Sequence, residues 1–419
     1  MLPLRVRIGL VSVALLALVA CTTSNWKIVP PVAKEHDAKA AASGVNAFAV
    51  DLYAQLRAQD GNLIVSPYSI STSLAMTATG AQGNTRAEME KVLHLPPGGK
   101  VGPAYRAMTD GTNGSTWLGG KSHAKYSELH VANSLWLQQG DTWKKEFLAT
   151  TKDDFGATLS GYDFVRDANE GRKRINKWAE DRTQSRIKDL VPEGALDANT
   201  RLVLANAIYF KANWASQFKK DDTREDNFAL ANGQTVRVPL MNQTGKFWLE
   251  ERAGFQVLKL PYAGGATAMY VLLPWAKEPL AGLEQKLTAQ NLEMWTRVSD
   301  KQQLEDVKVA LPKFKFTVPT ELAGVLHQMG MRDAFDPARA NFAGMTERAD
   351  GLHISRVIHK AFIETDEVGT EAAAATATVM SFRAAPSEKT FRADRPFLFV
   401  IKHEQTGAVL FMGRVANPS

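Results

Sequence analysis

The regular hydrophobic pattern of the chain starts at Val45. Between residues 45 and 56 apolar side chains recur at steps of three and four, which is the spacing of one buried face of a helix. A short apolar run at 63–65 follows and predicts a strand. Ser66 and Pro67 then predict the start of a second helix, because proline is favoured in the first helical turn.

Strand patterns dominate the second half of the chain. Residues 201–218 form a long apolar run rich in β-forming residues, which predicts a central strand. Residues 225–275 predict several further strands, and residues 397–415 predict two strands joined by a turn at 405–407. No internal repeat is visible. The pattern predicts one α+β domain, with helices first and antiparallel strands mainly later.

The amino-terminal region follows a different pattern. Arg5 and Arg7 precede an apolar run at 8–20, which is too short to span a bilayer as a helix and fits the hydrophobic part of a secretory signal. The run ends in Leu-Val-Ala-Cys at Cys21, which resembles the bacterial lipobox. This resemblance implies cleavage before Cys21 and lipid attachment to its sulfur. The alternative is an ordinary signal peptide with an incidental cysteine.

These features predict three parts of the chain. Residues 1–20 are a lipoprotein signal peptide, residues 21–43 are a flexible tether, and residues 44–419 are the folded domain. The protein is then exported and lipid-anchored to the cell envelope, with the domain in the periplasm or at the cell surface. The residue after the cysteine is Thr22 and not an acidic residue. In a Gram-negative cell the anchor is therefore expected in the outer membrane. The lipid would hold the domain near the membrane without the domain entering it.

Composition narrows the possible functions. The net charge is +6, but Lys and Arg are spread along the chain without a basic block, so no nucleic-acid partner is expected. One cysteine makes neither an internal disulfide nor a multi-thiolate metal site. The chain lacks a G-x-S-x-G, an H-E-x-x-H and a phosphate loop, so we expect no catalytic residues, no metal and no cofactor. An enzyme whose catalytic groups meet only in the fold remains an alternative.

One segment near the carboxyl end has few large side chains. Residues 369–377 contain five alanines, and no proline lies between Gly369 and Arg383. Alanine favours a helix, so a linker or a surface helix would explain the run by itself. The absence of proline also suits a strand, because no backbone donor is missing from the ladder.

Several blocks of the sequence resemble the serpin family in the family's order. They are NLIVSPYSISTSLAMTATGAQGNT, VANSLWL, LVLANAIYFKANW, VPLMNQTGKF, HKAFIETDEVGTEAAAATA, ADRPFLFVI and LFMGRVANP. The resemblance covers about 45–419. It implies an α+β serpin fold with three β-sheets, eight or nine helices and an exposed reactive-centre loop at about 367–391. It also implies a serine protease inhibitor rather than an enzyme.

The resemblance gives the alanine-rich segment a mechanism. In the family, whose loop insertion is an established example of strand addition, a protease cuts the loop and is trapped as an acyl-enzyme while the loop enters the large sheet. Small side chains favour fast entry into a packed interior. The hinge residues implied are Glu367, Gly369, Thr370, Glu371, Ala372, Ala373, Ala374 and Ala375. Gly369 is expected to supply a permissive backbone.

The alternation of a strand sets which hinge side chains enter the core. If Thr370 points inward, every second residue after it does too. This inward set is Ala372, Ala374, Thr376, Thr378 and Met380, and all except the last are small or β-branched. Glu371 lies in the outward set and can stay in solvent.

The same resemblance indicates the bond that a protease would cut. In inhibitory members the hinge glutamate lies sixteen residues before the scissile residue, and counting from Glu367 gives the bond Arg383–Ala384. Arginine there implies a trypsin-like protease, whose specificity pocket carries a carboxylate. Loop lengths vary in the family, so Phe382 or Ala385 are alternatives. Phe382 would suit a chymotrypsin-like or subtilisin-like protease, and the alanines an elastase.

Two further residue groups match family positions that control the large sheet. Ser66, Ser69, Asn206 and His359 match the shutter, a buried polar cluster beneath the centre of the sheet. Buried polar groups are satisfied in one arrangement and must re-pair in another, which suits a switch. The second group is the breach, where the loop first enters the sheet, and its residues are Trp214, Thr223 and Glu367.

The partners expected from the resemblance are few. They are a target protease in a covalent complex and a membrane reached only through the lipid. The protein is expected to be a monomer, and no basic helix resembles a heparin site. Two alternatives remain in this interpretation: a serpin-fold binding protein without inhibitory activity, and an inhibitor of cysteine proteases.

Overall fold

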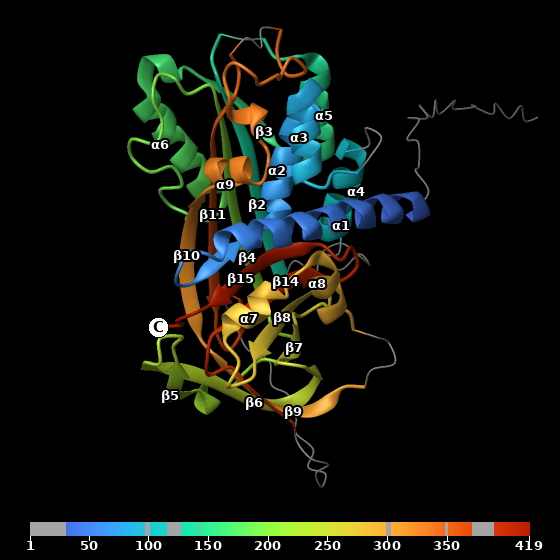
Figure 1. The fold of residues 1–419 in the computed structure, drawn as a ribbon, viewed down its shortest axis with the longest axis vertical. Helices are drawn as coiled ribbons and strands as arrows, with labels where there is room; N and C mark the ends of the chain where they lie inside the picture. The colour runs from blue at the N-terminus through green and yellow to red at the C-terminus, as the bar shows by residue number, and fades with distance from the viewer. Residues whose placement is uncertain are drawn as a thin grey trace, which may run out of the picture.

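The chain folds into helices packed on and between β-sheets, as Figure 1 shows. The computed structural model describes residues 31–96, 101–114, 127–140, 142–298, 303–347, 351–370 and 389–419. The helices in these ranges are α1 (Pro31–Leu56), α2 (Pro67–Thr79), α3 (Gly83–Val92), α4 (Val101–Gly114), α5 (Lys145–Phe155), α6 (Phe164–Arg182), α7 (Leu280–Gln285), α8 (Ala289–Trp295) and α9 (Ala323–Gln328).

The described strands are most frequent after residue 200. They are β1 (Leu63–Val65), β2 (Ser127–Gln138), β3 (Thr158–Tyr162), β4 (Leu202–Asn213), β5 (Arg224–Ala229), β6 (Thr235–Arg252), β7 (Phe255–Pro261), β8 (Thr267–Pro274), β9 (Glu305–Pro312), β10 (Phe314–Glu321), β11 (Ile354–Thr365), β12 (Gly369–Thr370), β13 (Lys389–Arg392), β14 (Phe397–His403) and β15 (Val409–Val415). The predicted α+β class and the strands at 63–65 and 397–415 are confirmed.

The first sheet has a mixed strand arrangement. Its order is β10-β11-β12-β4-β2-β3, and β11 also pairs directly with β4. The β4–β11 pairing is parallel and runs from Ile354 opposite Leu202 to Phe362 opposite Tyr209. Beyond that point β12 lies between the two strands and is antiparallel to both. We call the β4–β11 boundary the seam.

The remaining strands make two sheets that share one strand. The order is β1-β15-β14-β8-β7-β6-β9-β13, with β5 paired to β6. Strand β6 is long enough to belong to both sheets: its carboxyl-terminal part pairs with β7, and its middle part pairs with β9. Together with the first sheet, this makes the three sheets that the sequence predicts.

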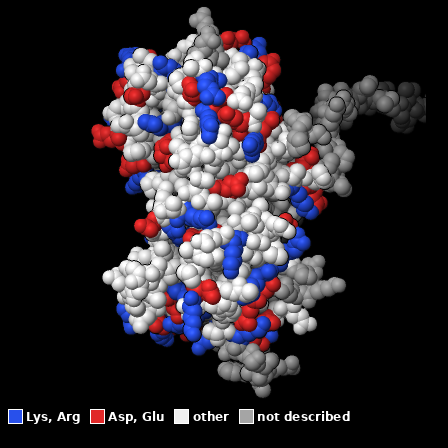
Figure 2. Space-filling view, in the orientation of Figure 1, with Lys and Arg blue, Asp and Glu red and all other residues white. Residues whose placement is uncertain are grey.

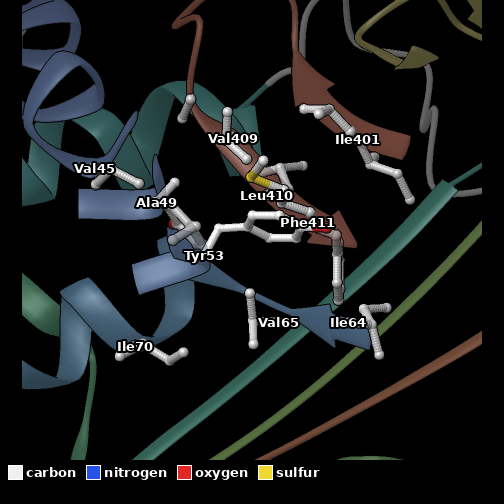
Figure 3. Close-up of a cluster of buried hydrophobic side chains, with 14 of the residues drawn as sticks. Val45, Ala49, Tyr53, Ile64, Val65, Ile70, Ile401, Val409, Leu410 and Phe411 are labelled. Atoms are coloured by element: carbon white, nitrogen blue, oxygen red, sulfur yellow. The ribbon is translucent and has the colours of Figure 1, made fainter. Parts of the chain in front are cut away.

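The main core lies between the first sheet and the β14–β15 pair. Helix α2 contacts β2, β4 and β15, so it fills the space between the sheets. Figure 3 shows part of this core, where Val45, Ala49 and Tyr53 of α1 approach Leu410 and Phe411 of β15. On the other face of the first sheet, α6 covers outward side chains of β2 and β4 such as Trp136 and Tyr209. Strand β4 is therefore buried on both faces.

Helix α1 starts earlier than the sequence predicts. It begins at Pro31, so residues 31–43, which were expected to belong to the flexible tether, are helical. Ala38, Ala41 and Ala42 are buried, and the helix packs along α4. These alanines continue the three- and four-residue spacing of Val45 and Phe48. The prediction missed them because small residues between charged ones also look like a linker.

None of the helices in the described part of the chain is both long enough and apolar enough to cross a membrane.

Candidate functional site

The hinge begins with a tight turn after β11. The Asp366 carboxylate accepts hydrogen bonds from the backbone N–H groups of Val368 at 2.9 Å and Gly369 at 3.1 Å. The Asp366 N–H in turn donates to the Gly369 carbonyl at 2.9 Å. This turn reverses the chain, so β12 starts back along β11 with Thr370 opposite Thr365. On its other side, β12 pairs Gly369 with Asn213 and Thr370 with Ala212.

Gly369 is required by space. A Cβ atom on this residue would lie 2.0 Å from the Ala212 carbonyl oxygen and 2.6 Å from the Asn213 Cα. Its backbone is not left-handed, so the permissive conformation expected from the sequence is not what the position uses. The glycine lets β12 approach the β4 backbone closely.

Thr370 points into the core, which is the condition on which the inward set of hinge residues depends. Its side chain is 1% exposed, and its hydroxyl is hydrogen-bonded to the Tyr262 hydroxyl at 2.8 Å. Tyr262 stacks on Trp214 with ring centroids 4.6 Å apart and an interplanar angle of 9°. Burial raises the pKa of Tyr262, although the bond to Thr370 partly offsets it, so the phenol stays neutral.

A narrow apolar gap lies beside Thr370. Its lining residues are Phe210, Phe362, Ile363, Ile401 and Phe411, and it has no room for a water molecule. The gap lies between β4 and β11 at the point where the two strands begin to separate around β12.

The predicted breach residues lie together around this turn. The Trp214 N–H donates to the Val368 carbonyl at 2.7 Å, and its indole Nε1 donates to the Asp366 carbonyl at 3.0 Å. The Glu367 carboxylate accepts from the Thr223 hydroxyl at 2.8 Å and from the Lys313 ammonium at 2.9 Å. Sequence reasoning missed Lys313, because no local pattern distinguishes it from other exposed lysines.

The charge of Glu367 is stabilised although the side chain is buried. Burial alone would raise its pKa, but the hydrogen bonds from Lys313 and Thr223, together with a backbone bond, outweigh burial and hold the pKa below its usual range. Glu367 is 4% exposed, so its charge depends on these partners. The result is a fixed anion at the first residue of the hinge.

The predicted shutter residues also meet, at the middle of the seam. His359 and Asn206 are directly paired across β11 and β4, and their side chains are hydrogen-bonded. Asn206 also donates to the Ser69 hydroxyl and to Asn133, which lies opposite it on β2. The Ser66 N–H donates to His359 Nε2 at 3.2 Å. Asn133 is a fifth member that sequence reasoning missed, although it lies in one of the quoted blocks.

The hydrogen bonds of His359 assign its protonation. Nε2 accepts from the Ser66 backbone, so the proton is on Nδ1, which donates to the Asn206 carbonyl oxygen. Complete burial lowers the pKa of His359 to about 3. The imidazole is therefore neutral and joins β4, β11 and the start of α2.

Several predicted site residues lie outside the described residues. They are Cys21, Glu371, Ala372, Ala373, Ala374, Ala375, Phe382, Arg383, Ala384 and Ala385. The lipidation site and the reactive bond therefore remain predictions. The carboxyl end of the loop is described from β13, which pairs in parallel with β9. Lys389 and Arg392 fix β13 through ion pairs with Glu305 and Asp226, each at 2.7 Å.

The surface chemistry of the described residues is mixed. Figure 2 shows Lys and Arg interspersed with Asp and Glu over the visible face. Within the described ranges no group of three or more His, Cys, Asp or Glu side chains is arranged to hold a metal ion.

The sheet with its parallel seam, and the hinge that enters it, can now be compared with known families. The family model described as serpin (serine protease inhibitor) matches residues 43–418. The chain therefore belongs to the serpin family.

Relatives and solved structures agree with this membership. The chain is 40% identical to a serpin-like protein of Thermococcus kodakarensis, over 92% of this chain and 88% of that one. It is 38% identical to the leukocyte elastase inhibitor of Sus scrofa, over 88% and 97%. The crystal structure of Serpin48 from Tenebrio molitor is similar with a TM-score of 0.78 and 30% identity, covering 90% of this chain and 98% of that one. The predicted serpin fold is confirmed.

Proposed function

We propose that this serpin inhibits serine proteases as a suicide substrate. The protease nucleophile attacks the carbonyl carbon of Arg383, the peptide bond to Ala384 breaks, and the amine of Ala384 leaves with the proton that the protease supplies. Arg383 is then esterified to the protease. The hinge enters the seam before water hydrolyses the ester, and the protease is carried along with it.

The observation that carries this proposal is the position of β12. Two hinge residues are already hydrogen-bonded between β4 and β11, and Thr370 is already inside the core. Insertion then extends an existing strand and needs no new nucleus. The next inward side chain, that of Ala372, is a single methyl group, so its entry would break few of the contacts along the seam.

The pairing of β12 also gives the register that insertion would follow. Each residue further along the loop meets the residue one position earlier on both neighbours. Six residues beyond Thr370, Thr376 would lie opposite both Asn206 and His359, because the Thr370 partners are Ala212 and Thr365. Insertion must separate that histidine from that asparagine. A threonine hydroxyl at this position can bond to either group and would keep the shutter polar atoms satisfied.

The energetic scale suits trapping. Insertion replaces the β4–β11 boundary with two boundaries, one on each side of the new strand. Each added backbone hydrogen bond contributes roughly 0.5–1.5 kcal/mol net. About ten inserted residues then contribute on the order of 10 kcal/mol, which is the stability scale of a whole domain. A process this favourable can distort a trapped enzyme.

The target follows from the residue offered. Arg383 favours a trypsin-like protease, since a guanidinium pairs with a carboxylate in the specificity pocket. The relatives named leukocyte elastase inhibitor favour a second candidate, an elastase-like protease cutting at Ala384 or Ala385. Because both bonds lie in the same loop, the cleavage site is what separates the two candidates.

The test is a denaturing gel after mixing the chain with excess trypsin, elastase or subtilisin in parallel. The expected result is a stable band at the summed mass with trypsin, absent in an Arg383→Glu variant. Mass spectrometry of the released carboxyl-terminal peptide should begin at Ala384. Full cleavage by every protease with complete residual protease activity would refute inhibition and favour the non-inhibitory alternative.

We also propose that lipid on Cys21 holds the protein at the cell envelope. The leader resembles a lipobox, and α1 begins only ten positions later. Fully extended, the intervening chain reaches about 35 Å. Metabolic labelling with a fatty-acid analogue should mark the expressed protein and not a Cys21→Ser variant. Equal labelling of the two would contradict the anchor without affecting the inhibition proposal.

A further inference from the structure

The end of the seam farthest from the hinge is closed by a side chain. Ile354 pairs with Leu202 and Arg356 pairs with Val203, so Ser355 is an extra residue of β11 without a partner on β4. The Ser355 hydroxyl accepts a hydrogen bond from the Arg201 backbone N–H at 2.9 Å. At this bulge a hydroxyl oxygen therefore takes the place of a backbone carbonyl.

Arg201 is held from both sides at this point. Its carbonyl accepts a hydrogen bond from the Gln138 N–H at the end of β2, at 2.8 Å. Its N–H faces the other way, towards β11, and is used by Ser355. The three neighbouring strands β2, β4 and β11 are thus joined at one residue just before β4 begins. The hinge contacts the opposite end of β4, at Ala212 and Asn213.

We propose that Ser355 is a positioning residue that closes the seam only while the loop is outside the sheet. This inference rests on the proposed function. A strand that continued from Thr370 in the present register would bring Met380 opposite Leu202. By the same count Met380 would lie opposite Ser355 on β11, so the inserted strand would run between Ser355 and Arg201. Neighbouring strands are about 4.8 Å apart, so an intervening strand would double the distance between β4 and β11. The Ser355 hydroxyl cannot reach the Arg201 N–H over that distance.

The hydrogen bond between the Arg201 N–H and the Ser355 hydroxyl therefore forms only while the loop is outside the sheet. After insertion the Arg201 N–H pairs with the backbone of the new strand, and the Ser355 hydroxyl turns to solvent, since the residue is half-buried. Removing the hydroxyl lowers the stability of the uninserted form and leaves the inserted form unchanged. A hydrogen bond away from the seam contributes equally to both forms.

Helix α8 offers a matched control. The Thr288 hydroxyl also accepts a hydrogen bond from a backbone N–H, that of Asn291 at 3.0 Å. It caps a helix away from the seam, so insertion should not change it. Thr288→Ala therefore removes the same kind of bond without the state dependence that we assign to Ser355.

The experiment compares melting temperatures of intact and loop-cleaved protein. For Ser355→Ala we expect the intact form to melt about 1–3 °C lower, the shift of one hydrogen bond in a chain of this size, with no change in the cleaved form. For Thr288→Ala we expect equal decreases in both forms. Ser355→Thr keeps the hydroxyl and should match the parent protein in both.

The outcomes separate this inference from the function on which it rests. If cleavage of the parent protein does not raise its melting temperature, insertion itself is refuted. If the parent rises but Ser355→Ala lowers both forms equally, or neither, only the role of Ser355 is refuted. A Ser355→Thr variant that behaves like Ser355→Ala would also overturn it, because the hydroxyl would then not be the active feature.

Discussion

Acidification should weaken the native fold through His359, and the size of the effect follows from its contacts. The native imidazole stays unprotonated to about pH 3, because it is fully buried and Nε2 accepts the Ser66 N–H. In the unfolded chain the same group takes up a proton below its ordinary pKa of 6.5. The unfolded state therefore binds more protons between these values, and stability falls as the pH is lowered through 6.5.

The magnitude between pH 8 and pH 5 can be worked from these values. A pH of 5 is about 1.5 pH units below the pKa of the unfolded histidine, and each pH unit corresponds to about 1.4 kcal/mol of stability. His359 alone therefore removes about 2 kcal/mol from the free energy of unfolding. His403 is also buried, which lowers its pKa to about 4, so it should remove a similar amount.

The assay is urea unfolding followed by tryptophan fluorescence at pH 8, 6.5 and 5. His359→Gln should lower stability at every pH, but the loss between pH 8 and pH 5 should shrink by about 2 kcal/mol. Glu367 should keep its charge between pH 8 and pH 5. Despite its burial, Lys313 and Thr223 hold the pKa of that carboxyl below its usual value.

The control is the exposed His327 on α9. His327→Gln makes the same change of side chain at the surface, without loss of the shutter hydrogen bonds. An unchanged pH dependence in His359→Gln would refute the reasoning, because it would mean that the shutter histidine accepts a proton without cost.

Four further substitutions test the hinge. Thr370→Arg should turn the inhibitor into a substrate on the denaturing gel, because an unpaired charge would replace a side chain that is 1% exposed; an undiminished complex band argues against insertion. Gly369→Val should expel β12, since a Cβ would meet the Ala212 carbonyl oxygen at 2.0 Å, and should reduce complex yield; normal yield contradicts the close approach. Lys313→Met should lower the free energy of unfolding by about 1–3 kcal/mol, with partial recovery on adding Glu367→Gln, and full stability of the single variant counts against the pair. Thr376→Val should lower the melting temperature of the cleaved form only; an equal effect on the intact form rules out the proposed register.

Local pattern predicted much of the fold because the strands carry their own signatures. The 63–65 strand, the Ser66 cap and the closing hairpin appear where apolar runs meet turn residues. The predicted start of α1 at Val45 was wrong, because Ala38 and Ala41 are buried only through packing on α4. Alanine in a polar context carries no information about which neighbour will cover it.

The candidate site likewise contains residues that the sequence predicted and residues that it did not. Its predicted members belong to recognisable blocks, and the structure brings the described ones together. Lys313, Asn133 and Tyr262 were not predicted, because each has its partner in a segment far away in the chain. Their contacts depend on register across the sheet, and register is a property of strand pairing that no single stretch contains.

The parallel seam between β4 and β11 has a consequence for how much work one molecule can do. On the proposed mechanism it is replaced by two antiparallel boundaries, which are the more stable kind of pairing. On this mechanism the hinge fills the seam once, and the change does not reverse. Under that mechanism each molecule would inhibit one protease, or be cleaved once without inhibiting it. On this mechanism the protection that a cell gains depends on the number of molecules it makes, and not only on their affinity for the protease.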